Sequence, residues 1–414
     1  MIVSVRASGA APDQDLDKRW PSVGFLFVGG EHQMLHIAPV AAELVRRGGI
    51  DVRAFVGDAD EERALHRLMV RLGVSMSIER LPSPGWTRML GRINPRWSAL
   101  KLPRLLAARA MLGRLDVLVV AERTSTLLNR LPGPHPCLIH IPHGMGDRAK
   151  GFERRIKMFD HVIVSGPKDR ARMIASGVVS PENCSVSGSI KLEAVAARPP
   201  GPPLFANGRP VVLYNPHFAA GLSSWPKFGR GLIAAFRDQD RFNLIVAPHV
   251  RLKEAMSPAE RSEIEALAVD GRIIVDLGSP RSHDMSYTRA ADIYLGDVSS
   301  QVYEFLSRPR PCVFLDTGHA DWANDPNFAF WHLGEVVSDP ALAFEAVTRA
   351  AARHGTFVAT QIKAASQAIG PLNTSPAATA AAIIIDHAYR HNDRHGRLPN
   401  GRHGAYRAIN ASKS

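Results

Sequence analysis

The stretch Val23-Gly-Phe-Leu-Phe-Val28, followed by Gly29-Gly30 and then by residues Glu31–Val45, decides the fold of the first half of the chain. The first run is apolar at almost every position, as is typical of a strand buried on both faces of a parallel sheet. Beyond the glycines, a set of apolar residues shares one helical face: Ile37, Val40, Ala41, Leu44 and Val45. A strand, a glycine turn and an amphipathic helix form the repeating unit of parallel α/β proteins.

Further short apolar runs predict more strands of the same kind. In the first half these are Val52–Val56, Val117–Ala121, Leu138–Ile141 and Val162–Ser165, and in the second half Val211–Tyr214, Leu244–Ala247, Ile273–Val275, Ile293–Leu295 and Cys312–Leu315. The two series are separated by Arg198–Pro203, which reads Arg-Pro-Pro-Gly-Pro-Pro. Proline fixes φ and lacks an amide donor, so we interpret this segment as an interdomain linker.

The pattern predicts an α/β protein with two Rossmann-like domains that face one another across a cleft. We expect a flexible N-terminus at 1–20, one domain at 21–198 and a second at 204–340. Alanine-rich C-terminal helices are expected over 341–389, where they can pack back onto the first domain. A disordered basic tail is expected at 390–414, because few of its residues are apolar.

Composition narrows the classes of partner. The 414 residues include 51 Lys and Arg against 39 Asp and Glu, for a formal charge of +12, which favours anionic partners. No zinc-finger spacing or RNA-binding aromatic pattern occurs, so nucleic acid is not expected as a partner. Three widely separated cysteines, Cys137, Cys184 and Cys312, argue against a disulfide framework and for a reducing cytosol.

Membrane association is expected to be peripheral at most. The first twenty residues have no apolar signal-peptide core, and no stretch approaches the roughly 20 apolar residues of a membrane span. The segment Arg88–Arg109 interleaves basic residues with Trp and Leu, which suits the anionic inner face of the cytoplasmic membrane. An ordinary amphipathic helix with its apolar side packed inward explains the same pattern equally well.

The richest polar segment, Gly296–Glu304, follows the strand Ile293–Leu295. Ligands of parallel sheets bind beyond the carboxyl ends of the strands. Asp297, Ser299 and Ser300 would lie at a helix start, where amides and hydroxyls can hold a phosphate. Glu304, one turn further on, could accept hydrogen bonds from ribose hydroxyls. Plain helix capping by Asp297 or Ser299 is an equally good explanation.

Two other strands in the second half end in Pro-His, at His217 and His249. A proline there halts the ladder and directs the next side chain outward. A single such histidine usually has a structural role, but two in equivalent places favour a function. Ser223 and Ser224 follow His217 and could contact a phosphate or a base, or simply form a loop.

The first half offers comparable residues after its own strands. Gly29 and Gly30 permit close backbone approach to a ligand, and His32 and His36 follow them. His143, with Gly144 after it, ends another strand and leads to Lys150. A histidine in the cleft can act as a general base, although His32 could instead cap or pack its helix.

The sequence lacks the motifs of P-loop phosphate hydrolysis, zinc proteolysis and serine-esterase chemistry. No P-loop, His-Glu-x-x-His or Gly-x-Ser-x-Gly pattern occurs. Asp58 and Asp60 have the spacing of a metal-binding acidic pair, but helix capping explains them better. No metal or cofactor is expected.

The motifs together resemble a known family. Asp297-Val-Ser299-Ser300, followed by Arg310-Pro-Cys-Val-Phe, is similar to a segment of the CDP-glycerol glycerophosphotransferases, the teichoic-acid polymerases. The pair His143-Gly144 with Lys150, and also His249, resemble further motifs of that family. The resemblance implies a two-domain GT-B fold and transfer of glycerol phosphate to a hydroxyl, including that of a lipid-linked acceptor. It also implies that His143 is the base and that His249, Ser299 and Ser300 bind the donor phosphates.

The same segment also looks like that of the UDP-N-acetylglucosamine 2-epimerases, whose phosphate-binding Ser-Gly-Gly and ribose-binding Glu match Ser299-Ser300 and Glu304 in position. We therefore expect a transferase that moves a glycosyl or polyol-phosphate group from a CDP- or UDP-linked donor, in the second domain, to an acceptor hydroxyl held by the first. Cell-envelope polysaccharide synthesis is the expected setting. His143, His249 and His32 are its candidate catalytic residues. An epimerase-type isomerase and an inactive module that binds polyanions or membranes are the alternatives.

Overall fold

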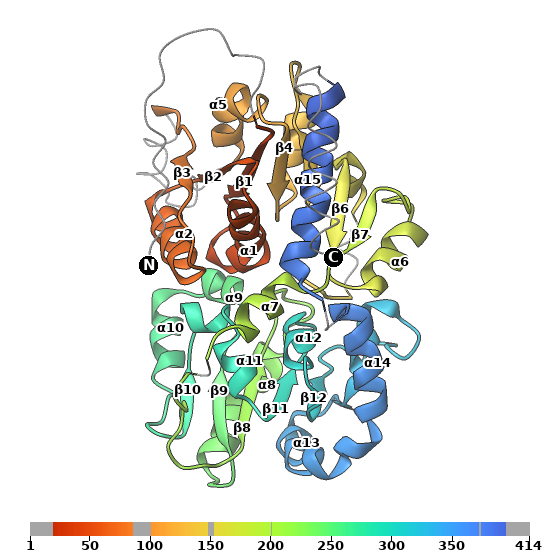
Figure 1. Ribbon diagram of the computed structural model, residues 1–414. Helices are drawn as coiled ribbons and strands as arrows, with labels where there is room; N and C mark the ends of the chain where they lie inside the picture. The colour runs from red at the N-terminus through yellow and green to blue at the C-terminus, as the bar shows by residue number, and fades with distance from the viewer. Residues whose placement is uncertain (1–19, 86–100, 148–152, 200, 372–373, 395–414) are drawn as a thin grey trace.

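The computed structural model describes residues 20–85, 101–147, 153–199, 201–371 and 374–394. Within them the chain forms two parallel β-sheets with helices on both faces, one sheet above the other in Figure 1. The expected α/β fold with two Rossmann-like domains is thus confirmed. Lys150 and the greater part of Arg88–Arg109 lie outside the described residues.

The first sheet has seven strands in the order β3-β2-β1-β4-β5-β6-β7. Their bounds are β1 Ser22–Phe27, β2 Asp51–Val56, β3 Ser77–Arg80, β4 Val117–Val120, β5 Cys137–His140, β6 His161–Val164 and β7 Cys184–Val186. Strand β1 lies between β2 and β4, so that Phe25 is opposite Ala54 on one side and Val119 on the other. All of β1 is buried, which explains why its sequence is apolar on both faces.

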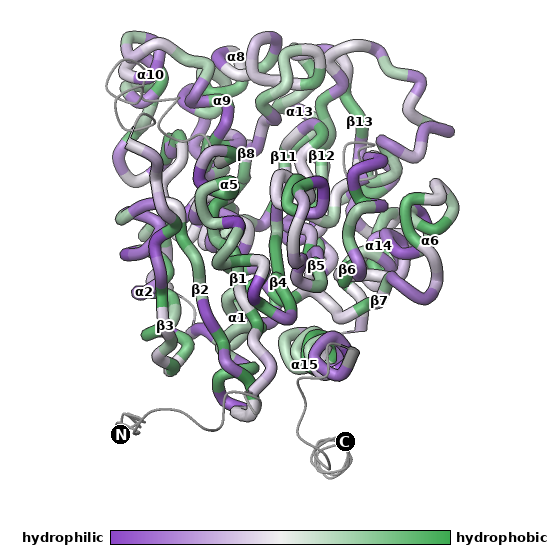
Figure 2. Tube along the Cα trace, turned by 90° about the horizontal axis from the view of Figure 1, so that it is seen from above, coloured by the Kyte–Doolittle hydropathy of each residue, from purple (hydrophilic) through white to green (hydrophobic). Residues whose placement is uncertain are grey.

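The second sheet has six strands in the order β10-β9-β8-β11-β12-β13. These are β8 Val211–Asn215, β9 Asn243–Val246, β10 Ile273–Val275, β11 Ile293–Gly296, β12 Cys312–Leu315 and β13 Glu335–Val337. Both sheets therefore reverse strand order beside their first strand, which is the Rossmann arrangement that opens a crevice at the carboxyl ends. Parts of β4 and β11 are strongly hydrophobic in Figure 2, in keeping with their burial.

The helices that cover the sheets are α1 Glu31–Arg47, α2 Ala59–Arg71, α5 Lys101–Leu112, α6 Pro167–Ala175, α7 Ile190–Ala196, α8 Trp225–Arg237, α9 Val250–Ala255, α10 Pro258–Glu265, α11 Ser286–Ala290, α12 Gln301–Phe305, α13 Pro340–Arg353, α14 Val358–Ile369 and α15 Pro376–Arg394. Short 3-10 helices lie at η1 Thr124–Arg130, η3 Arg154–Met158, η4 Pro280–Ser282, η5 Pro326–Leu333 and η6 His354–Thr356.

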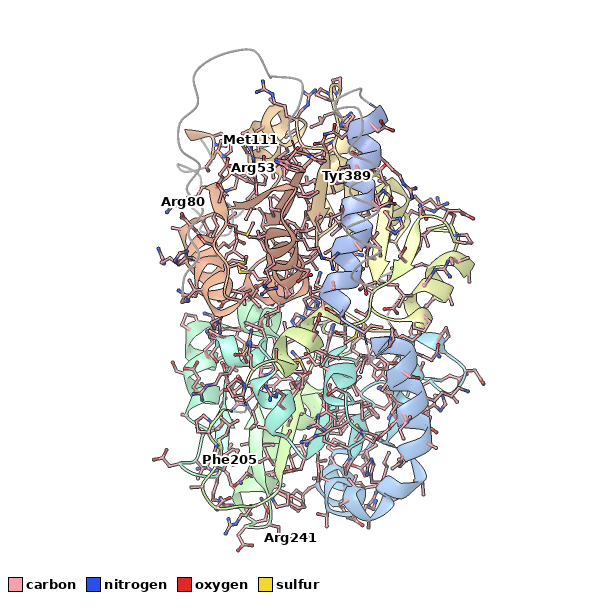
Figure 3. The ribbon with its side chains drawn as sticks, in the orientation of Figure 1. Arg53, Arg80, Met111, Phe205, Arg241 and Tyr389 are labelled. Atoms are coloured by element: carbon pink, nitrogen blue, oxygen red, sulfur yellow. The ribbon has the colours of Figure 1, made fainter. Side chains whose placement is uncertain are left out.

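The C-terminal helices divide between the two domains. Helix α13 packs on the second sheet, α14 touches both α12 and α6, and α15 lies along α1, β4 and β5 of the first domain. Tyr389 of α15, labelled in Figure 3, is buried and its hydroxyl donates to the Gly49 carbonyl at 3.4 Å. The last helix thus returns to the domain in which the chain began.

Helix α15 continues to Arg394, so residues 390–394 are helical and do not belong to a disordered tail. Asn392 is fully buried and donates to the Asp116 carboxylate at 3.3 Å. An i,i+4 ion pair between Asp386 and Arg390 supports the same turn. The polar sequence of this stretch does not reveal its contact with Asp116, which directly precedes β4 and is distant in the chain.

Candidate functional site

The loops at the carboxyl ends of the two sheets meet where the domains face one another. The loop after β5 lies against the loop after β11: a Cβ placed on Gly144 would come within 3.5 Å of the Ser300 hydroxyl, and one on Gly146 within 2.9 Å of the Ser300 Cβ. Beside this contact, the Tyr303 hydroxyl donates to Asp147 at 2.7 Å. The sequence placed these loops in different domains, and the structure brings them together.

Histidines from three segments gather on the first-domain side of this junction. His32, in the first turn of α1, has its ring centroid 5.7 Å from that of His143 and 6.2 Å from that of His283. His36 lies 6.4 Å from His143. Burial, followed by the positive charge of Lys191, holds the pKa of His36 well below its ordinary value. Two of the expected first-domain histidines, His32 and His143, therefore share one site.

His143 is held in one tautomer. Its Nδ1 lies 2.8 Å from the carbonyl oxygen of Ala121, and because a carbonyl only accepts, Nδ1 carries the proton. In the neutral ring the lone pair then resides on Nε2, which is the form that a general base requires. The side chain is exposed, so an acceptor hydroxyl can approach it.

His217 and His249 have the same local geometry after the neighbouring strands β8 and β9. Each Nδ1 accepts a hydrogen bond from the amide two residues later, at 3.1 Å from Ala219 and at 3.2 Å from Arg251. The proton of each neutral ring is therefore on Nε2. Their ring centroids are 5.7 Å apart, so the two Nε2–H groups form a pair of neighbouring hydrogen-bond donors.

His249 is suited to binding an anion but not to removing a proton. Burial, with a smaller contribution from His217, lowers its pKa to about 3, and its Nδ1 is engaged by the backbone. It is neutral at pH 7 and donates from Nε2. Of its two expected roles, catalytic residue and phosphate ligand, the geometry favours hydrogen bonding to a phosphate.

Asp297 does not have the role of a helix cap. It is buried, and its oxygens accept from the amides of His217 (2.9 Å), Ser224 (2.6 Å) and Val298 (2.5 Å) and from the Ser224 hydroxyl (2.8 Å). Burial raises its pKa. Asp297 therefore ties the loop after β8 to the loop after β11, and its carboxylate is occupied by the protein itself.

The two serines after His217 are structural for the same reason. Ser224 is fully buried between Asp297 and the Tyr214 hydroxyl, which lies 3.0 Å from its Oγ. The Ser223 hydroxyl accepts from the Trp225 amide at 3.3 Å. Both serines lie at the start of α8, and Ser224 bonds to Asp297, while contact of Ser223 and Ser224 with a donor stays a prediction.

Ser299 and Ser300 differ from each other. The Ser299 hydroxyl is buried and accepts from the Gln301 amide at 3.4 Å, as a cap would. Ser300 is the N-cap of α12, but its side chain makes no capping hydrogen bond. It is half-buried and lies against Gly144. Capping thus accounts for Ser299, whereas Ser300 presents its hydroxyl toward the junction between the domains.

Glu304 is paired with a residue that the sequence analysis missed. The Lys191 ammonium donates to its Oε1 at 2.7 Å, and the two side chains are only 6% and 10% exposed. Lys191 belongs to α7, which follows the edge strand β7. Because β7 is only three residues long and has a serine at its centre, no apolar run in the sequence marks it or the loop that follows it.

The glycines after β1 have conformational reasons for being glycine. Gly30 has φ of 96°, a region that favours glycine, and its amide donates to Glu61 at 3.1 Å. A Cβ on Gly29 would collide with the side chain of Gln33. These constraints shape the turn into α1, and close approach of a ligand there stays a prediction.

No group of three or more His, Cys, Asp or Glu side chains in the described part of the chain is arranged to hold a metal ion. Asp58 accepts from the amides of Asp60 and Glu61 and so caps α2. Arg310, part of the motif that follows α12, donates to the carbonyls of Thr288 and Ala291 at 2.9 and 2.6 Å and is structural.

The two Rossmann-like sheets, with their carboxyl ends face to face, define a GT-B-like fold. No known family model matches the sequence, and no curated protein is significantly similar to it. Solved structures with this fold do match across almost the whole chain. One is the UDP-GlcNAc 2-epimerase from Neisseria meningitidis bound to UDP-GlcNAc, with 14% identity, a TM-score of 0.54 and coverage of 89% of this chain and 100% of that one.

Two further solved structures are similar over almost the whole chain. MnaA of S. aureus with UDP has 12% identity and a TM-score of 0.57, covering 90% of this chain and 97% of that one. The wall teichoic acid polymerase TagF with CDPG has 12% identity and a TM-score of 0.60, covering 92% and 91%. At this level of identity the likeness establishes the fold.

Proposed function

We propose that this protein is an enzyme that transfers a glycosyl or polyol-phosphate group from a CDP- or UDP-linked donor to an acceptor hydroxyl. The observation that carries the proposal is that histidines with opposite tautomers lie on the two sides of the domain junction. His143 has its lone pair on Nε2, as a base requires, while His217 and His249 each have a proton on Nε2 for donation. One side can accept a proton from a hydroxyl while the other binds phosphate.

The two groups interact electrostatically across the junction. A charge on His143 or His283 contributes to the lowered pKa of His249, and Ser300 lies beside Gly144, the residue after His143. In this proposal Ser300 and the Nε2–H groups of His217 and His249 bind the donor phosphates and stabilise the charge that develops on the leaving phosphate. His143 removes the proton from the acceptor hydroxyl as it attacks, and His32 lies beside it to orient the acceptor.

An epimerase-type reaction is the second candidate, because two of the similar structures are UDP-GlcNAc 2-epimerases or bind UDP. That reaction needs carboxylates able to move protons on the sugar. The Glu122 carboxylate is already bonded to the amides of Thr124 and Ser125, and Glu304 is paired with Lys191. Both of these carboxylates are engaged, whereas Glu31, the other acidic residue near a first-domain strand end, acts electrostatically on His283. Epimerisation therefore stays the second candidate.

The test is a screen of CDP- and UDP-linked compounds by calorimetry, followed by measurement of product mass with and without a hydroxyl acceptor. Transfer predicts donor binding and a product that forms only with acceptor. A new sugar formed from the donor alone would establish the epimerase reaction instead. Failure to bind any member of the panel would refute both and leave a binding module.

A peripheral location on an anionic membrane completes the proposal, with a lipid-linked acceptor as the substrate it would serve in envelope synthesis at the cytoplasmic face. Helix α5 exposes Leu102 and Leu106, one turn apart and each 44% exposed, within the basic segment Arg88–Arg109. No helix within the described ranges is both long and apolar enough to cross a bilayer. Exposed leucines beside basic residues suit an interfacial contact.

A further inference from the structure

The ion pair of Lys191 and Glu304 lies where the two domains face one another. Lys191 comes from the first turn of α7, and Glu304 from α12, one helical turn after Ser300. The ammonium and carboxylate are 2.7 Å apart and almost fully buried. Lys191 also acts electrostatically on His36 and on His283, which belong to different domains. The positive charge of Lys191 therefore acts on histidines from both domains at the candidate site.

The burial of this lysine needs a reason. Among the described residues, Lys191 and Arg310 are the only lysine or arginine side chains classed as buried. Arg310 donates to backbone carbonyls and stacks on the Phe305 ring at 3.7 Å. A buried ion pair stabilises a fold no better than well-packed apolar residues of the same size. Packing α7 against α12 would not by itself require a charged pair.

His249 can bind a nucleotide diphosphate but cannot neutralise its charge. His249 is neutral at pH 7 because burial lowers its pKa to about 3, so it supplies a hydrogen bond but no charge. A diphosphate that leaves water for this site brings two acidic phosphates, and buried charge is costly unless it is paired. The proposed chemistry therefore favours a cation close to Ser300.

We propose that Lys191 is the cation that binds the diphosphate of the nucleotide donor, an inference that rests on the proposed function. In the donor-free protein its charge is held by Glu304. When the donor binds, the ribose hydroxyls take hydrogen bonds from the Glu304 carboxylate, and the ammonium on its flexible stem turns to the phosphates at Ser300. Lysine suits this exchange because it is a point charge with three rotatable donors.

The experiment compares CDP and UDP with cytidine and uridine, which lack phosphate, by ligand-observed NMR competition. Lys191→Met should weaken binding of the diphosphates by roughly ten- to hundredfold, as expected for loss of a hydrogen bond to a charged group, and leave nucleoside binding within threefold. Lys191→Arg should retain most of the preference for diphosphate. Lys168→Met is the matched control, because Lys168 also pairs with a buried carboxylate at this junction, that of Asp147 at 2.5 Å, and has no role in the proposal.

The following results would overturn the proposed role of Lys191. Equal weakening of diphosphates and nucleosides by Lys191→Met, or an equal effect of Lys168→Met on the diphosphates, means that the pair is merely structural and overturns the inference. If Lys191→Met does not fold, the double variant Lys191→Met/Glu304→Gln buries no lone charge and is compared with Glu304→Gln alone, with the same expected loss of preference. A wild-type protein that binds neither CDP nor UDP overturns the proposed function and this inference with it.

Discussion

Replacing Asp297 by asparagine tests whether this carboxylate connects the two loops of the candidate site. Its Oδ2 accepts from the Ser224 amide and hydroxyl and its Oδ1 from the Val298 amide, while the His217 amide is shared between both. An asparagine NH₂ cannot accept, so in either orientation it faces at least one amide N–H. A buried donor left without a partner costs about 1–3 kcal/mol.

The expected loss is about 3 kcal/mol, because one amide is orphaned and the remaining charge-assisted bonds weaken. For a domain of roughly 200 residues this corresponds to a fall in Tm of roughly 6–12 °C. Thermal unfolding followed by circular dichroism measures it. Donor affinity should fall as well, since the backbone of His217 is one of the anchored groups.

Asp292→Asn is the control for this experiment. The Asp292 carboxylate also accepts a hydrogen bond from a backbone amide, that of Val211 at 2.8 Å. It is exposed, however, and directly precedes β11, at the end of the strand opposite Asp297. Water can replace the lost hydrogen bond at this exposed site, so the Tm of the Asp292→Asn variant should differ little from that of the wild type. If Asp297→Asn and Asp292→Asn unfold within 1–2 °C of each other, Asp297 does not connect the loops, and our account of the site is wrong.

Four other outcomes are expected. Ser300→Ala should weaken donor binding by roughly ten- to hundredfold in calorimetry, since one hydroxyl contact is lost and the amides remain; unchanged affinity would place the phosphates elsewhere. His143→Ala should lower kcat by about 10²–10⁴-fold and largely spare donor affinity, whereas a loss confined to affinity would contradict its role as base. Burial raises the pKa of Asp169 from 3.8 to about 6, so stability falls as pH rises through 4–6 and stays reduced above it. Asp169→Asn should remove that slope in urea unfolding and add up to about 3 kcal/mol at pH 7, and a slope that persists would refute the assignment. Leu102→Gln/Leu106→Gln should reduce sedimentation with anionic liposomes but leave turnover on a soluble acceptor intact, and equal sedimentation by wild type and variant would exclude α5 as the contact.

The sequence alone was sufficient for the architecture. Buried parallel strands are apolar on both faces, so runs such as Val23–Val28 and Leu244–Ala247 could be recognised locally. The edge strands β3, β7 and β13 were not predicted because each is short, is only partly buried and contains a polar residue. The edge strand β10 is as short, but it is wholly apolar and was predicted. Parallel topology places the loops that follow the strands at one edge of each sheet, which is why the sequence could predict His143, His249 and Ser300 as candidates there.

What those side chains do was decided by the tertiary structure. Whether Asp297 caps a helix or ties two loops depends on amides 73 and 80 residues away, and the partner of Glu304 lies 113 residues before it. The tautomers of His143 and His249 depend on which backbone group lies next to each Nδ1. Local sequence determines which residues are apolar and where strands end, but hydrogen-bond partners are set by distances between segments that only the folded chain brings together.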